Sequence, residues 1–215
     1  LHRDLFVATK VWTQGKAAGV RQMESSIAKL GTAAKGALDL MQVHNLVDVD
    51  AHLATLRDWK AAGRIRYIGV THYHRDAHAA LEKLVRSVEL DFIQINYSIA
   101  EPEAGARLLP AARERGVAVI VNRPFAEGAM FSRVRGRAIP SAMRDAYGIT
   151  TWAQLFLKWI LADPAVTCAI PGTRSRAHVL DNLTAATALL PGEPGTFNAS
   201  REDQRKAIGE VFREA

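Results

Sequence analysis

Short apolar runs alternate with amphipathic stretches along most of the chain. Runs rich in Val, Ile, Leu and aromatic residues predict strands at 5–12, 38–46, 65–73, 90–99, 117–125 and 166–173. Stretches in which apolar residues recur every three or four positions predict helices at about 20–35, 50–63, 76–88, 103–115, 149–163 and 176–190. Because a helix follows each strand, the pattern predicts an α/β protein with a parallel sheet covered by helices.

Two architectures fit this alternation, an open doubly wound sheet and a (β/α)8 barrel. The first strand–helix connection has no G-x-G-x-x-G pattern, and the chain has no G-x-x-x-x-G-K-[ST] pattern. These absences argue against an open nucleotide-binding sheet. A barrel of this class has eight units, whereas the pattern gives six. We therefore expect an incomplete (β/α)8 TIM-type barrel in which the first two units are missing.

Composition and charge narrow the class of protein. The chain has 215 residues, of which 48% are hydrophobic, so we expect a folded partial barrel over 1–190 and a polar tail over 191–215 with a helix at about 201–213. The net charge of +6 favours a small anionic ligand. The basic residues are scattered, which argues against nucleic acid, and no apolar run reaches the roughly 18 residues of a membrane span. Cys168 is the only cysteine, which excludes an internal disulfide and a multi-cysteine zinc site.

Polar residues recur where the predicted strands end. They are Lys10, His44, Thr71, His72, Gln94, Asn96, Asn122, Arg123, Pro171, Gly172 and Thr173. The carboxyl ends of parallel strands form the active-site face in α/β proteins. We therefore expect these residues to share one site.

Two of these residues also have a structural explanation. Lys10 fits a strand-end lysine that reaches solvent, and His44 fits a core histidine bonded to backbone, because a buried polar group without a partner costs about 1–3 kcal/mol. The stretch "HYHRDAH" brings His72, His74 and His78 close together and suggests a metal site. Its spacing matches no common zinc signature, and neither a carboxylate nor a cysteine partner is evident. We therefore expect no metal.

The stretch "IPGTRSRAHVLDNL", residues 170–183, predicts an anion site. A strand ends at Pro171, a Gly–Thr turn follows, and the next helix opens among Arg174, Arg176 and His178. Free backbone N–H groups and the helix dipole favour negative charge at such a position, and barrels often bind phosphate at their last units. The alternative is a basic helix start that faces water.

The same segments resemble the aldo-keto reductases over about residues 4–190. The resemblance is carried by "ATKVW", "LDLMQVHNL", "AGRIRYIGVTHY", "FIQINYS", "VAVIVNRPFAEG" and "AIPGTRSRAHVLDNL". It implies a (β/α)8 barrel that binds NADPH without a Rossmann domain. It also implies reduction of small aldehydes and ketones by hydride transfer.

The resemblance also implies roles for individual residues. Lys10 and His44 match the catalytic lysine and histidine. The positions that bind the carboxamide end of the cofactor fall on Thr71, His72 and Gln94. Asn122 takes the place of the aromatic residue that stacks on the nicotinamide, and Arg123 lies beside it. The phosphate turn falls on Gly172, Thr173 and Arg174, and the adenine end on His178, Asp181 and Asn182. Arg174 and Arg176 favour NADPH over NADH.

The sequence departs from the family where the proton donor belongs. The catalytic Asp and Tyr of the family lie in a unit upstream of the lysine strand, and none of Tyr67, Tyr73, Tyr97 and Tyr147 occupies the tyrosine position. We therefore expect a fragment that is weak alone and that self-associates through the open seam between its first and last units. Two alternatives stay open: a non-catalytic NADPH-binding sensor subunit of the same fold, and a phosphosugar lyase or isomerase that uses Lys10 as a base or Schiff base.

Overall fold

Six parallel strands form one sheet in the order in which they occur along the chain. The computed structural model describes residues 4–32, 36–187 and 201–214. The strands are β1 (Ala8–Val11), β2 (Leu38–His44), β3 (Ile65–Thr71), β4 (Phe92–Asn96), β5 (Ala118–Asn122) and β6 (Val166–Ala169). Their order is β1-β2-β3-β4-β5-β6, whereas a doubly wound sheet reverses its order at a switch point. The prediction of six parallel strands is confirmed, and the consecutive order is that of a barrel wall.

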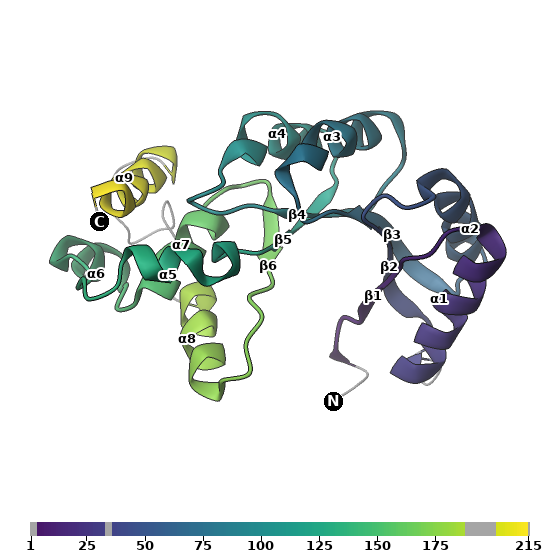
Figure 1. The fold of residues 1–215 in the computed structure, drawn as a ribbon, viewed down its shortest axis with the longest axis horizontal. Helices are drawn as coiled ribbons and strands as arrows, with labels where there is room; N and C mark the ends of the chain where they lie inside the picture. The colour runs from purple at the N-terminus through teal and green to yellow at the C-terminus, as the bar shows by residue number, and fades with distance from the viewer. Residues whose placement is uncertain (1–3, 33–35, 188–200, 215) are drawn as a thin grey trace.

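Helices connect successive strands and lie outside the curved sheet (Figure 1). The main helices are α1 (Lys16–Leu30), α2 (Val49–Ala61), α3 (His78–Ser87), α4 (Leu108–Glu114), α7 (Trp152–Leu161) and α8 (Arg176–Thr187). Short 3-10 turns lie at η3 (Arg75–Ala77), η4 (Glu103–Ala106) and η5 (Ala126–Gly128), and the β5–α7 connection also holds α5 (Ala129–Arg133) and α6 (Ser141–Tyr147). Within the described ranges, no helix combines the length and the hydropathy that a membrane span requires.

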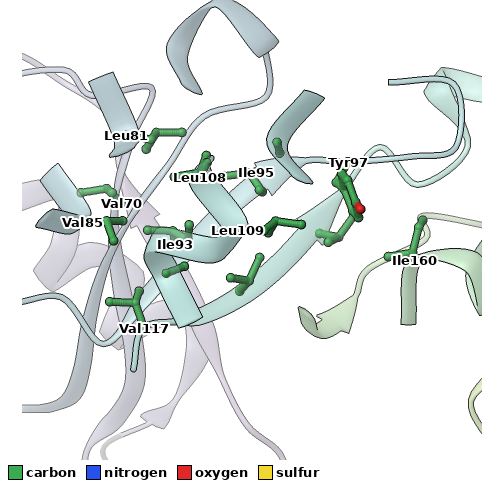
Figure 2. Close-up of a cluster of buried hydrophobic side chains, with 14 of the residues drawn as sticks. Val70, Leu81, Val85, Ile93, Ile95, Tyr97, Leu108, Leu109, Val117 and Ile160 are labelled. Atoms are coloured by element: carbon green, nitrogen blue, oxygen red, sulfur yellow. The ribbon is translucent and has the colours of Figure 1, made fainter. Parts of the chain in front are cut away.

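The core lies between the sheet and these helices. Residues that alternate along β4, such as Ile93 and Ile95, are fully buried. Figure 2 shows them in one cluster with Leu108 and Leu109 of α4. The alternate positions of the strands face the other side of the sheet, which leaves that side free to carry polar residues.

Helix boundaries differ from the sequence prediction. The helix predicted from residue 20 begins at Lys16 and ends at Leu30, because Gly31 adopts a left-handed conformation with φ of 62°. The helix predicted to end at residue 63 ends at Ala61.

The tail contains α9 (Arg201–Glu214), which is not polar on all sides. Ile208 and Phe212 are buried, and the Phe212 ring lies 5.3 Å from that of Phe156 in α7. This apolar face packs on the barrel segment. Positions 191–200 of the predicted tail lie outside the described residues.

Candidate active site

Strand register brings the predicted catalytic residues to one side of the sheet. Lys10 pairs with Gln42, and His44 lies two residues further along β2 on the same side. His44 pairs with Thr71, and Thr71 pairs with Gln94. These side chains of β1 to β4 therefore line the face of the sheet opposite the helices.

His44 is partly buried and is electrostatically coupled to its neighbours. Burial lowers the pKa of His44, and the charges of Lys10 and His72 lower it further. The Trp12 ring meets the imidazole edge-on, with 5.4 Å between ring centroids and an interplanar angle of 85°. Lys10 is exposed, and no hydrogen bond or ion pair joins its amine to another group in the described part of the chain. An imidazole with a lowered pKa and an exposed lysine side chain therefore lie on the same side of the sheet.

Buried polar atoms without partners gather at the same strand ends. Within the described residues they include His44 Nδ1, Gln42 Oε1, Asn45 Oδ1, Thr71 Oγ1 and Asn122 Oδ1. Each orphaned group costs about 1–3 kcal/mol. Three of them are amide oxygens, which accept hydrogen bonds. A ligand that carries an amide N–H2 group, such as the carboxamide of a nicotinamide, fits this set.

Two side-chain hydrogen bonds link these strand ends. Gln42 Nε2 donates to Gln94 Oε1 at 3.2 Å, and Asn122 Nδ2 donates to the carbonyl oxygen of His72 at 3.3 Å. Gln42, which we did not predict as a site residue, holds Gln94 in place. Strand alternation gives the signal, because Leu40, Gln42 and His44 must point to one side.

The three histidines after β3 are separately engaged. His72 Nδ1 accepts a hydrogen bond from the backbone N–H of His74 at 3.1 Å, and His78 Nε2 lies 2.9 Å from Asn96 Oδ1. Burial is the largest cause of the lowered pKa of His72. In the ranges that the structure describes, no group of three or more His, Cys, Asp or Glu residues could hold a metal ion.

A cavity of about 830 Å³ lies beside α8; Arg123 lines it, whereas Lys10, His44, Thr71, His72, Gln94, Asn122 and Arg174 do not. Its walls carry aromatic side chains and most of the predicted phosphate and adenine residues. They include Arg123, Phe125, Phe131, Trp152, Gly172, Thr173, His178, Asp181 and Asn182. The Arg123 guanidinium bonds Glu127 at 2.8 Å and lies 4.2 Å from the centroid of the Tyr73 ring. The volume falls within the range of small-molecule and cofactor sites.

The first turn of α8 is ordered by local hydrogen bonds. Thr173 Oγ1 accepts from the backbone N–H of Ser175 at 3.1 Å, and Ser175 Oγ accepts from that of His178 at 3.4 Å. Arg174 and Arg176 are exposed at this end. Two cationic side chains therefore flank the positive end of a 12-residue helix.

Asp181 has contacts with α7 that the sequence does not predict. Its carboxylate accepts hydrogen bonds from Thr151 Oγ1 at 2.8 Å and from Gln154 Nε2 at 2.6 Å. Thr151 also caps α7, where its hydroxyl accepts from the Gln154 backbone N–H. Asp181 thus ties α8 to α7 as well as lining the cavity, and the sequence spacing of about 30 residues gave no signal of this.

The aldo/keto reductase family model matches residues 2–194. The chain belongs to the aldo/keto reductase family. Among curated relatives, it is 30% identical over 92 residues to the NADH-specific methylglyoxal reductase of Escherichia coli (strain K12). The aligned stretch covers 43% of this chain and 27% of that relative. It is 23% identical to aldo-keto reductase str7 of Strobilurus tenacellus over 88% of the chain and 66% of the relative. The chain therefore spans 66% or less of these two aldo/keto reductases.

Solved aldo/keto reductase structures align with most of the chain. The holo form of AKR11C1 from Bacillus halodurans aligns with a TM-score of 0.71 and 22% identity, over 97% of this chain and 72% of that one. An aldo/keto reductase from Klebsiella pneumoniae, in complex with NADP and acetate, aligns with a TM-score of 0.68 and 26% identity, over 95% and 70%. The six strands thus align with the TIM-barrel structures of this family.

Proposed function

We propose that this aldo/keto reductase chain binds NADPH and takes part in the reduction of small aldehydes and ketones to alcohols. The observation that carries the proposal is the group of orphaned polar atoms at the strand ends near Lys10 and His44, together with a cavity whose wall includes residues from the start of α8. The Klebsiella pneumoniae relative was solved with NADP bound, and the yakc relative from Schizosaccharomyces pombe is an NADP(+) enzyme by its name. These two relatives support NADPH as the cofactor, whereas the Escherichia coli relative is NADH-specific by its name.

Residues of the described chain would hold the cofactor in three places. Thr71, Gln94 and Asn122 would bind the carboxamide, with His72 and Arg123 beside it. Gly172, Thr173 and Arg174 would bind phosphate at the start of α8, and His178, Asp181 and Asn182 would hold the adenine end. The bound cofactor supplies the hydride.

Lys10 and His44 would act on the carbonyl substrate. Because the pKa of His44 is lowered, its imidazole is neutral at neutral pH, and it can orient the carbonyl oxygen by one hydrogen bond. The Lys10 ammonium lies on the same side of the sheet and would favour negative charge that develops on that oxygen.

We further propose that two βα units in addition to the six described close the barrel between β6 and β1 and carry the catalytic Asp and Tyr. The sheet supports this, because β1 and β6 are its edges and a closed barrel of this class needs eight strands. By itself the 215-residue chain would then turn over slowly, since loss of a positioned general acid costs about 10²–10⁴ in rate.

The test combines NADPH titration of the purified chain with an assay for reduction of 4-nitrobenzaldehyde. We expect saturable NADPH binding, weak turnover by the 215-residue chain, and rapid turnover when two βα units of a related reductase are joined before β1. If neither the 215-residue chain nor the extended protein binds NADPH, the proposal is overturned. Rapid turnover by the 215-residue chain would overturn the assignment of the proton donor to further units.

A second candidate is a regulatory subunit that binds NADPH without catalysis. It is favoured by the observation that, within the described residues, Lys10 has no carboxylate or tyrosine partner. NADPH binding together with no turnover by the extended protein would select this candidate over the reductase.

A further inference from the structure

The loop after β1 is held by side chains from two helices. It runs from Trp12 to Gly15 and connects the strand of Lys10 to α1. Gln22 Oε1 accepts from the Trp12 backbone N–H at 2.7 Å, and Asp48 Oδ2 accepts from the Gly15 N–H at 2.6 Å. His52 Nε2 lies 2.8 Å from the carbonyl oxygen of Thr13.

Of these anchors, His52 is the buried one. Its side chain in α2 has 0% exposure, while the loop residues Trp12 and Gly15 are exposed. A carbonyl oxygen only accepts hydrogen bonds, so Nε2 must carry the proton that is donated to Thr13. Nδ1 has no hydrogen-bond partner in the described part of the chain. The imidazole is therefore held to the loop by a single hydrogen bond from Nε2.

Gly19 in α1 allows this arrangement. A Cβ at position 19 would lie 2.3 Å from His52 Cε1 and 2.6 Å from Nδ1. The imidazole thus packs directly on the backbone of α1, where no larger residue fits. The pair Gly19 and His52 locks α1, α2 and the loop together.

The loop in turn places Trp12 against His44. The Trp12 side chain is 60% exposed, so few contacts of its own fix its direction. Its ring nevertheless meets the His44 imidazole edge-on at 5.4 Å. The loop anchors fix the backbone from which this exposed indole extends: Gln22 bonds Trp12 itself, and His52 bonds the next residue, Thr13.

We propose that His52 is a positioning residue that holds the Trp12 indole against His44 through its bond to Thr13. The consequence for substrate selection, that Trp12 forms an aromatic wall on the carbonyl side of His44, rests on the proposed function. The contact itself does not, so the test below needs neither cofactor nor turnover.

The test follows the His44 Cε1–H signal by NMR, which the Trp12 ring current shifts. His44→Gln assigns the signal, and Trp12→Leu gives the size of the shift. We expect His52→Leu to move the signal most of the way to its Trp12→Leu position. His52→Gln, whose amide can donate to Thr13, should restore the wild-type position. The matched control is Thr55→Val, which should leave the signal unchanged. Thr55 is a buried polar residue of the same helix, and among the described residues its hydroxyl bonds the Ala51 carbonyl oxygen alone.

Three results would overturn the proposal. One is a His44 signal that does not respond to Trp12→Leu, and another is a His52→Leu signal at the wild-type position. Because His52→Leu also removes a buried side chain, a second measurement uses the unaltered chain. Nitrogen-15 NMR of His52 should show a proton on Nε2, and an Nε2 without a proton would be the third contradicting result.

Discussion

At the residue scale, the site depends on charges that act over short distances at the strand ends. Lys10 and His44 come from neighbouring strands, and their side chains lie on one face of the sheet because a side-chain period of two is fixed along each strand. The pKa of His44 is lowered by burial first and by Lys10 second. The site therefore combines a free cation with an imidazole that resists protonation.

Lys10→Met should raise the pKa of His44, because it removes a positive charge that disfavours the imidazolium. The pKa should stay below its ordinary value, since burial is the larger cause. NMR titration of the His44 signal measures this directly. Lys60→Met is the control, because Lys60 is paired with Asp91 on the surface. An unchanged His44 pKa in Lys10→Met would contradict the coupling.

Arg174→Met should weaken NADPH binding by about tenfold or more, because a hydrogen bond to a charged group contributes about 1.5–3 kcal/mol and tenfold in affinity is about 1.4 kcal/mol. NADH, which lacks the 2′-phosphate, should bind equally to both proteins. Fluorescence titration with each cofactor compares them. Arg21→Met, an exposed arginine in α1, should change neither affinity. Equal losses for both cofactors would place Arg174 away from the 2′-phosphate.

At the element scale, the sheet requires a close approach between β3 and β4. Gly69 in β3 is buried, and a Cβ at this position would lie 2.5 Å from the Phe92 carbonyl oxygen. The register pairs these two residues directly. A side chain here would separate the strands that carry Thr71 and Gln94.

Gly69→Ala should lower the free energy of unfolding by about 1–3 kcal/mol, the typical cost of overpacking. Urea unfolding followed by circular dichroism measures the change. Gly172→Ala is the matched control, because nothing lies within 4 Å of its Cβ position, and its effect should stay within about 0.5 kcal/mol. Equal stability of the two variants would show that β3 and β4 separate without cost.

The sequence predicts the buried strands better than it predicts the short helices. All six strands were found, because each has an apolar run bounded by polar residues. No helix was predicted in the connection at 125–148, although α5 and α6 lie there. A helix of five or seven residues completes two turns at most, so periodicity gives little signal.

The sequence predicts those parts of the candidate site in which a single polar residue stands at the end of an apolar strand. Lys10, His44, Thr71 and Gln94 share a face of the sheet, as expected for strand-end residues. The Trp12 loop and its anchors His52 and Asp48 were not predicted, since their contacts join positions more than 30 apart in sequence. Only tertiary structure brings such pairs together.

At the scale of the whole molecule, the sheet has two edges with apolar side chains near them. Phe6, which precedes β1, is 52% exposed, and Leu180 in α8 next to β6 is 56% exposed. Val179 and Ile170 add to the apolar surface beside β6. Edges of this kind favour pairing with another chain.

The 215-residue chain should therefore self-associate through these edges, and Leu180→Glu should shift it toward monomer, because a carboxylate in an apolar contact costs free energy. Sedimentation velocity over a range of concentrations measures the change. Ala80→Glu adds the same charge at an exposed position of α3 and should leave association unchanged. A wild-type chain that stays monomeric at high concentration would contradict the role of the edges.

A crystal structure of the chain with NADP+ tests whether the carboxyl ends of these six strands form one NADPH site. We expect the carboxamide against Thr71, Gln94 and Asn122, and the 2′-phosphate beside Arg174 at the start of α8. NADP+ bound on the helix side of the sheet, or in reversed orientation with its adenine end beside His44, would rule out this site.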